Sequence, residues 1–260
     1  MARRGARVQQ LAEGVHTLTL GRGIRAVNVY LVRSGGSLVL VDTGWGSSAP
    51  AIRRALEDLV GPEVRPSAIL LTHIHPDHSG AALALARGWG LPLLVHPDEL
   101  VLARGGVVPQ WANPLDRRFI APLLRLVPRR RLEARIERDS LEHDVQPLGP
   151  DLSVPGLPDW RCIPVPGHTP GHIALFRERD RVLITGDAVL TTRLLSLRTL
   201  LTRGPVVCGP PRISTWDWPA ATSSVTLLAG LRPEVIASGH GRPLVGPDAG
   251  DLLERLAASL

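Results

Sequence analysis

The chain has 260 residues, of which 44% are hydrophobic, and carries a formal net charge of +6. This length can bury a full core, either as one large domain or as two small ones. No apolar run reaches about 18 residues, so the sequence predicts no membrane span. The basic start is followed by Val8–Glu13, which is not the apolar core of a signal peptide. We therefore expect a cytoplasmic protein.

The charge comes from arginine alone, because all 30 basic residues are arginine and lysine is absent. A basic surface can attract nucleic acid or anionic substrates. However, only Arg129–Arg131 forms a tight run, and aromatic residues make up just 3% of the chain. Without the stacking platform of single-strand binders, nucleic acid is not the expected partner. Cys162 and Cys208 are far apart in the sequence, where a disulfide is possible but buried thiols are favoured. Neither belongs to a CxxC pair, which excludes a cysteine-rich zinc site.

Short apolar runs predict strands in the first part of the chain. These runs cover residues 15–20, 27–32, 38–41, 68–71 and 91–95. A helix is expected over residues 50–60, where Ile52, Leu56 and Leu59 share one face. Ser79 is expected to cap a second helix over residues 80–87.

Residues 97–150 differ in character, since they hold most of the charge runs and several prolines. We interpret them as a helical insertion over a compact core, with helix-like pieces near 115–127 and 131–138. Beyond the insertion, strands and helices alternate around an irregular stretch at 188–216. Strands are expected over 160–165, 173–177, 182–185 and 235–237, and helices over 218–231 and 248–260. Many strands followed by interleaved strands and helices indicate two sheets with helices outside them.

The most informative segment directly follows the strand predicted over 68–71. Within six positions it holds a cluster of three histidines and one aspartate, namely His73, His75, Asp77 and His78. Imidazole nitrogens and carboxylates are the ligands that borderline first-row metals prefer. Pro76 stiffens the turn between them. This cluster therefore predicts a metal site.

Further candidate ligands follow three other predicted strands, each beside a glycine. They are His168, Asp187 and His240. Glycine at such a place lets the backbone turn sharply and approach an ion closely. Seven ligands are too many for one tetrahedral zinc, whereas they suit two metal ions with one bridging carboxylate.

These residues resemble a known family. The segment from His73 to His78 is similar to the HxHxDH signature of the metallo-β-lactamase superfamily. Asp42, His168, Asp187 and His240 match that family's other motif positions in the expected order, and the resemblance covers roughly residues 15–245. It implies an α+β fold, a four-layered αββα sandwich with metals at one edge of its two sheets. We expect one domain over 1–260, with the insertion at about 97–150.

The resemblance also implies a role for each candidate residue. By that resemblance, one metal would be held by His73, His75 and His168. The other would be held by Asp77, His78 and His240. Asp187 would bridge the two ions, Asp77 would also orient the attacking hydroxide, and Asp42 would orient a ligating imidazole. His172 is expected to hydrogen-bond within the core beside the site. The expected cofactor is two zinc ions, with iron or manganese as alternatives.

The reaction that the resemblance implies is hydrolysis, with a metal-bound hydroxide attacking the ester or thioester carbonyl of a small molecule, as in the glyoxalase II branch. Alternatives are lactonase or β-lactamase activity at the same site, a mononuclear iron persulfide dioxygenase, and a nucleic-acid phosphodiesterase. β-Lactamases usually lack the bridging aspartate, and lactonases typically have a tyrosine near it, whereas the sole tyrosine here is Tyr30. Glyoxalase II proteins add a C-terminal helical domain, for which little room follows Asp187. A homodimer is left open.

Overall fold

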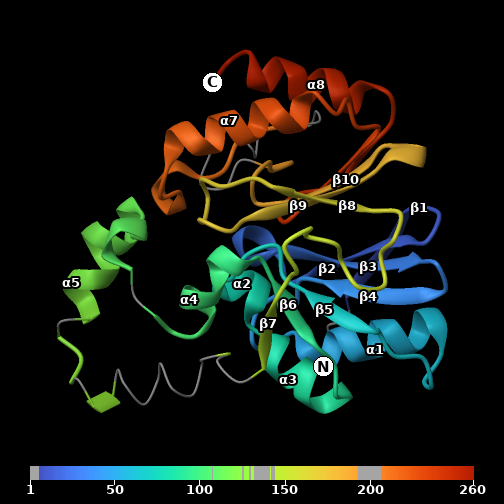
Figure 1. Ribbon diagram of the computed structural model, residues 1–260, viewed down its shortest axis with the longest axis horizontal. Coiled ribbons are helices and arrows are strands. Elements are labelled where there is room, and N and C mark those ends of the chain that lie inside the picture. Colours follow the sequence, from blue (N-terminus) through green and yellow to red (C-terminus); the bar gives the residue numbers. More distant parts are fainter. Residues whose placement is uncertain are drawn as a thin grey trace.

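The computed structural model describes residues 6–106, 108–124, 126–128, 130–131, 141, 144–192 and 206–260. Two sheets lie face to face, and helices cover the outer face of each sheet (Figure 1). These helices are α1 (Ala49–Val60), α3 (Ala82–Trp89), α7 (Trp218–Ala229) and α8 (Asp248–Ala257). From the top of Figure 1 downward, the layers are α7 with α8, the smaller sheet, the larger sheet, and α1 with α3. This is the αββα sandwich that the sequence predicts.

In the described residues the larger sheet has seven strands, arranged in the order of the sequence. They are Arg7–Ala12 (β1), Val15–Leu20 (β2), Val27–Ser34 (β3), Ser37–Val41 (β4), Ala68–Leu70 (β5), Leu93–Val95 (β6) and Val145–Pro147 (β7). Strands β1 to β4 pair antiparallel, whereas β4 to β7 pair parallel. Because parallel strands end at the same edge, the loops after β4 and β5 begin side by side.

The smaller sheet has five strands in the described residues, in the order β12, β11, β10, β9 and β8. Their bounds are Arg161–Pro164 (β8), Ile173–Arg177 (β9), Val182–Gly186 (β10), Val235–Ser238 (β11) and Leu244–Val245 (β12). Strands β10 and β11 are parallel and the other neighbours antiparallel. The loops after β10 and β11 therefore also share one edge.

Three apolar cores separate the four layers. Between the two sheets, Val39, Leu70 and Ile173 belong to one buried cluster. A second cluster joins the larger sheet to α1 and α3, and a third joins the smaller sheet to α7 and α8. In α1, Ile52 and Leu56 are buried, as their helical spacing predicts. Burial of these cores is the main term that holds the sandwich together.

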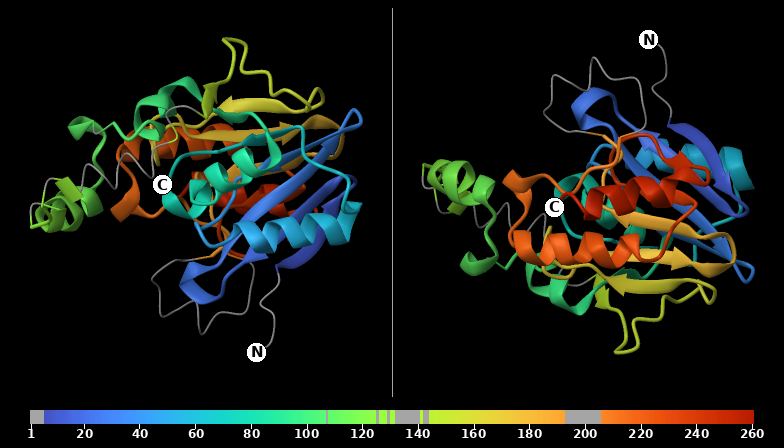
Figure 2. Two further views of the ribbon diagram at one scale, coloured as in Figure 1. Left: turned by 90° about the horizontal axis from the view of Figure 1, so that it is seen from below. Right: turned by 90° about the horizontal axis from the view of Figure 1, so that it is seen from above.

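Short helical segments connect the layers. They include α2 (Pro76–Ser79), Pro97–Glu99, α4 (Leu100–Ala103), Pro109–Trp111, the π-helical turn Asp116–Ile120 and α5 (Ala121–Leu124). Helix α5 projects away from the sandwich in both views of Figure 2. Within the described ranges, none of the helices combines the length and apolar character needed to cross a membrane.

The structure differs from the sequence predictions in several details. Strand β1 was not expected, because its polar residues are exposed and it joins the edge of the sheet by backbone pairing with β2. Strand β7 was also missed; it pairs with β6 from within residues 97–150. The predicted cap at Ser79 is wrong, since its hydroxyl donates to the Ile74 and His75 carbonyls and α3 begins at Ala82. The helix expected over 131–138 lies, beyond residue 131, outside the described residues.

Candidate metal centre

The candidate site lies where strands of both sheets end at one edge of the sandwich. In the larger sheet, Asp42 follows β4 and the segment His73–His78 follows β5. In the smaller sheet, Asp187 follows β10 and His240 follows β11, while His168 lies in the turn between β8 and β9. The packing of the two sheets thus gathers side chains that are distant in the sequence.

The donor atoms of the predicted ligands form three groups of three, and within each group they lie within 4.8 Å of one another. We call one group the imidazole triad; it consists of His73, His75 and His168. We call another the mixed triad; it consists of Asp77, His78 and His240. The third group, His73, His78 and Asp187, takes one histidine from each triad, so the two triads are parts of one cluster.

Asp187 lies between the two triads. Its Oδ2 atom is 3.7 Å from His168 Nε2 and 3.5 Å from His240 Nε2. Its Oδ1 atom is 3.4 Å from His78 Nε2. With donor atoms of both triads this close, Asp187 has the position that a bridging carboxylate requires.

Four of the five imidazoles are held through Nδ1, which leaves Nε2 facing the centre. The Nδ1 partners are Thr72 Oγ1 for His73 (3.1 Å), Asp42 Oδ2 for His78 (2.8 Å), Thr215 Oγ1 for His168 (3.3 Å) and the Ala26 carbonyl for His240 (2.7 Å). The ring of His75 has the opposite orientation, with Nδ1 facing the centre at 3.0 Å from His168 Nε2. A partner on one ring nitrogen fixes which nitrogen presents its lone pair to a metal.

Asp42 supports both triads at once. Its Oδ1 accepts the Thr72 backbone N–H at 2.8 Å, and its Oδ2 accepts the Thr72 hydroxyl at 2.8 Å. The same Oδ2 holds His78, and the Thr72 hydroxyl in turn faces His73 Nδ1. Asp42 adopts a left-handed backbone with φ of 61°, a conformation that aspartate tolerates better than most residues. The turn after β4 thus brings one buried carboxylate to His78 directly and to His73 through the Thr72 hydroxyl.

His172 lies against Asp187 and belongs to neither triad. Its Nε2 accepts the Asp187 backbone N–H at 3.0 Å, and its ring stacks on that of His73 with centroids 4.7 Å apart. Burial lowers the pKa of His172 to about 3, so the ring stays neutral and can accept this hydrogen bond. A Cβ atom at Gly186 would lie 2.7 Å from His172 Cε1, and one at Gly239 would lie 2.2 Å from Asp187 Oδ1. Only glycine allows these close approaches.

Burial sets the protonation of the imidazole triad. It lowers the pKa of His73 and His168 well below the usual value, and it also lowers the pKa of His75. Neighbouring imidazoles lower the pKa of His73 further. All three rings are therefore neutral near neutral pH, which is the form that binds a metal.

In the mixed triad, nearby carboxylates raise the pKa values of the imidazoles, against the effect of burial. Burial would lower the pKa of His240, but Asp187 and Asp77 raise it to about 10. Likewise, burial opposes the charge of His78, yet Asp187 and Asp42 raise its pKa well above the usual value. Without a cation, the mixed triad therefore holds protons that compensate its carboxylates.

The donor atoms at the centre fit a cation. Of the buried polar atoms without a hydrogen-bond partner among the described residues, four belong to the predicted ligands, namely His73 Nε2, His78 Nε2, Asp187 Oδ1 and His240 Nε2. Buried polar atoms normally have partners, and leaving one unpaired costs about 1–3 kcal/mol. Imidazole and carboxylate lone pairs are the donors that zinc and iron accept. The residues present thus fit bound metal.

Glu99 is a residue of the site that the sequence analysis missed. Its side chain is only 1% exposed, although it lies in a short helical turn of the presumed insertion. Its Oε2 accepts the Ile74 N–H at 3.1 Å, and its Oε1 accepts the Gly171 N–H at 2.8 Å. Glu99 therefore ties the loop with two members of the imidazole triad to the loop with the third. A signal was present, since Glu99 follows a short apolar strand as the predicted ligands do.

The remaining histidines and the cysteines lie outside the centre. His96 accepts the Asp98 backbone N–H at 3.2 Å, and His16 lies in β2. His143 falls outside the described residues. Cys162 and Cys208 form no disulfide with each other, and burial raises the pKa of the Cys162 thiol to about 12.

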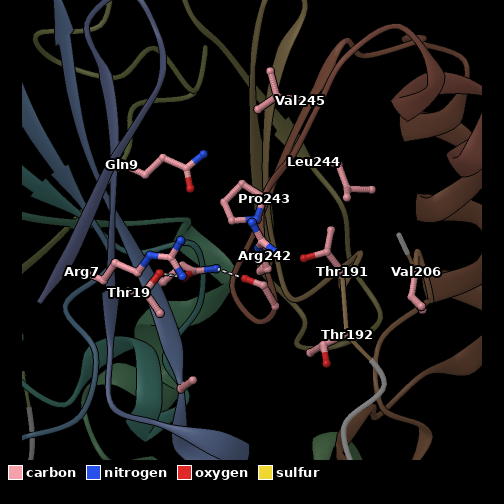
Figure 3. Close-up of a pocket in the computed structure, with 13 residues that line it drawn as sticks. Arg7, Gln9, Thr19, Thr191, Thr192, Val206, Arg242, Pro243, Leu244 and Val245 are labelled. Carbon is pink, nitrogen blue, oxygen red and sulfur yellow. Dashed lines mark hydrogen bonds between the residues drawn. The ribbon is translucent and has the colours of Figure 1, made fainter. Parts of the chain in front are cut away.

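A cavity of about 600 Å³ adjoins the centre, because His75 and His168 form part of its wall. Another cavity, of about 630 Å³, is lined by Arg7, Arg242 and other polar residues, as Figure 3 shows. That cavity is slightly larger, but none of the predicted ligands lines it. Of these two cavities, the one beside His75 and His168 opens onto the candidate centre.

Comparison with known proteins agrees with the motifs. The family model of the metallo-beta-lactamase superfamily matches residues 22–240. A probable metallo-hydrolase of Bacillus subtilis (strain 168), YflN, is 36% identical over 255 residues, which cover 96% of this chain and 92% of that protein. The chain therefore belongs to the metallo-beta-lactamase superfamily, and the resemblance seen in the sequence is confirmed.

Two further similarities bear on chemistry. The chain is 26% identical over 221 residues to the thioesterase pkgB of Emericella nidulans, covering 84% of this chain and 46% of that protein. It also resembles the solved structure of TTHA1623 in a di-iron-bound form, with a TM-score of 0.59 and 26% identity. That match covers 93% of this chain and 99% of the other.

Proposed function

We propose that this superfamily member, a metal-dependent hydrolase, binds two metal ions and cleaves an ester or thioester of a small molecule. The observation that carries the proposal is the pair of triads with Asp187 between them. One ion would lie at the imidazole triad, the other at the mixed triad, and Asp187 would contact both. Similarity to a named thioesterase supports the ester or thioester class.

Two bound ions would lower the pKa of a shared water toward ~7 and polarise the carbonyl under attack. The chain's own residues would keep the geometry of this reaction. Asp42, Thr215 and the Ala26 carbonyl hold imidazoles in place through Nδ1. Asp77 would orient the attacking water, because its side chain is 22% exposed and so reaches the open side of the mixed triad.

The protonation of Asp77 suits this role. Burial would raise its pKa, but His240, whose Nε2 lies 3.2 Å from Asp77 Oδ2, and the neighbouring His78 lower it below the usual value. The carboxylate is therefore ionised near neutral pH and can accept a hydrogen bond from water. A thiol nucleophile is disfavoured at Cys162, because burial raises the pKa of that thiol to about 12.

Zinc is the first choice for the metal, and iron is the main alternative. Both accept imidazole and carboxylate ligands, and a similar solved structure holds two iron ions. A mononuclear iron enzyme that oxidises persulfides would instead bind one iron per chain and consume oxygen. A nucleic-acid phosphodiesterase would bind RNA with an affinity that falls steeply with salt.

Metal quantification tests these proposals. The protein is purified without added metal, its metals are measured, and it is assayed with the matching metal on ester, thioester, lactone and β-lactam substrates. Two ions per chain and hydrolysis of an ester or thioester are expected. The variant His96→Ala serves as a control, since His96 lies outside both triads. One iron per chain with oxygen uptake, or no hydrolysis with any metal, would contradict the proposal.

A further inference from the structure

We infer that the acyl part of the substrate is an extended, uncharged apolar group that lies in the cavity of about 600 Å³ beside the imidazole triad. We call this the acyl cavity. The inference rests on the proposed hydrolase function and names its substrate class, which is esters or thioesters of medium and long apolar acids.

The position of the acyl cavity connects it to the reacting carbonyl. One wall is formed by Ile74, His75, His168 and Thr169, which belong to the two loops that carry the imidazole triad. Residues of the mixed triad do not line it. In the proposed reaction the ion at the mixed triad would stabilise the leaving group, so the acyl group would lie on the opposite side of the carbonyl, toward the imidazole triad and this cavity.

The opposite wall is formed by residues of the ranges 102–106 and 108–121. Its lining side chains are mostly apolar and include Val108, Trp111 and Ile120. An apolar group that leaves water for such a wall gains binding free energy in proportion to the area buried. The wall therefore favours hydrocarbon over polar substituents.

The polar side chains of the opposite wall have partners nearby. The Asp116 N–H donates to Asn113 Oδ1 at 2.9 Å, and Asp116 Oδ2 accepts the Asn113 N–H at 3.4 Å. The Arg117 guanidinium donates to the Gln110 carbonyl at 3.3 Å. Asp116 and Arg117 both line the cavity, so their opposite charges offset each other and give a carboxylate no net attraction. Because a carboxylate would also lose its hydration among the apolar side chains, the cavity disfavours acyl groups that end in one.

The size of the acyl cavity excludes a preference for the shortest acids. Its volume lies within the range of about 300–1,000 Å³ that is typical of small-molecule sites. An acetyl group would leave most of this space to water. Each methylene that an acyl chain adds inside the cavity is expected to raise kcat/KM about fourfold, until the cavity is full.

The other cavity lies away from the predicted ligands. Its lining is mixed, since Figure 3 shows Arg7, Gln9 and Arg242 together with Val206, Pro243 and Val245. Because none of the predicted ligands lines it, that cavity does not border the reacting carbonyl. Of these two cavities, the one beside the imidazole triad therefore fits the acyl group.

The test uses the metal-loaded wild-type protein and a series of p-nitrophenyl esters, namely acetate, butyrate, hexanoate, octanoate and decanoate. The half-ester of adipic acid supplies a chain that matches hexanoate in length but ends in a carboxylate. We expect kcat/KM to rise about fourfold per methylene from acetate to hexanoate. The adipate half-ester is expected to react at least about tenfold more slowly than hexanoate.

Matched variants assign the preference to the acyl cavity. Ile120 lines the cavity, whereas its neighbour Phe119 is 54% exposed and does not line it. Ile120→Ala should lower the octanoate-to-acetate ratio of kcat/KM about tenfold, because the chain loses part of its apolar wall. Ala112→Phe should lower that ratio by at least as much by filling the cavity. Phe119→Ala should leave it unchanged.

The outcomes separate the inference from the proposed function. A wild-type protein that hydrolyses acetate as well as decanoate, or that prefers adipate, would overturn the inference and leave the hydrolase function intact. Failure to hydrolyse any ester or thioester, acetate included, would contradict the proposed function and the inference with it. Equal ratios in Ile120→Ala and Phe119→Ala, with metal content and thermal unfolding unchanged, would also overturn the inference.

Discussion

The imidazole triad and the mixed triad lie side by side, with the rings of His73 and His78 only 4.2 Å apart, yet they differ in proton occupancy. In the imidazole triad, burial lowers the pKa of each ring, and His73 is neutral near neutral pH. In the mixed triad, Asp187 and Asp42 outweigh burial and raise the pKa of His78. Histidine side chains are thus neutral in one part of the site and protonated in the other.

This difference in protonation predicts the order in which the two triads bind metal ions. An ion that binds the imidazole triad meets lone pairs and displaces no protons near neutral pH. An ion that binds the mixed triad must displace the protons held by His78 and His240, and it then takes over their role of compensating the carboxylates. We expect the imidazole triad to fill first.

The largest expected effect comes from removing one ligand of each triad. His168→Ala should lose the ion at the imidazole triad, and Asp77→Ala should lose the ion at the mixed triad. Each variant should lower kcat/KM on the order of 10³-fold, because a metal ion contributes several kcal/mol to the transition state. The measurements are metal content per chain and hydrolysis with matched metal, with His96→Ala as the control. Full turnover and full metal content in either variant would show that the ligand assignment is wrong.

The second prediction concerns pH. Histidines with raised pKa values must lose protons to bind a metal, so higher pH strengthens binding at the mixed triad. The pKa of His240, about 10, places the whole range from pH 6 to pH 8 below its titration. Affinity for the second ion should therefore rise about 10- to 100-fold per pH unit in that range, with release of roughly two protons.

Affinity for the first ion should change little above the usual imidazole pKa and fall only at lower pH, because its ligands have lowered pKa values. Calorimetric titration of the metal-free protein in buffers with different ionisation enthalpies measures the protons released by each ion. Equal proton release for both ions would contradict the distinction between the triads.

Asp42→Asn tests the residue that supports both triads. The amide would place a donor where Asp42 Oδ2 now faces the Thr72 hydroxyl and His78 Nδ1. Because this change misaligns a ring of each triad, we expect affinity for both ions to fall about 10- to 100-fold. Asp144→Asn, which alters a surface ion pair with Arg87, is the matched control. Loss of only one ion would show that Asp42 supports a single triad.

The smallest predicted effect on metal binding is that of Glu99→Gln, which should act on one triad alone. An amide can accept only one of the two backbone N–H bonds that Glu99 now accepts from Ile74 and Gly171. Affinity at the imidazole triad should fall about tenfold, while the mixed triad keeps its affinity. Asp98→Asn serves as the control, because it also removes one carboxylate, from the neighbouring exposed residue. Equal weakening of both ions would refute a specific role for Glu99.

Much of the site could be predicted from the sequence because its chemistry is local. The segment from His73 to His78 holds four donors in six positions, and no ordinary core or surface pattern combines them in that way. Asp187 and His240 follow short apolar strands beside glycines, which is a pattern visible without a structure. The strands themselves were predictable where apolar residues recur within a short segment, as in β2 and β9, whose expected and observed bounds agree.

Other features depend on contacts between segments that are distant in the sequence. Strand β1 has no apolar pattern of its own and forms through backbone pairing with β2. Glu99 acts through hydrogen bonds to Ile74 and Gly171, and no spacing in the sequence relates it to both. The acyl cavity likewise exists only because the fold places Trp111 and the loop of His168 around the same space.

The donor set and the order of its motifs can be read from the amino-acid sequence, because metal affinity resides in the side chains themselves. The division of those donors into a neutral triad and a protonated one, in contrast, depends on the fold. That division depends on burial and on distances from Asp187 and Asp42 to individual rings. Both quantities arise from packing the two sheets, since pKa values respond to the three-dimensional surroundings of a group rather than to its neighbours in the chain.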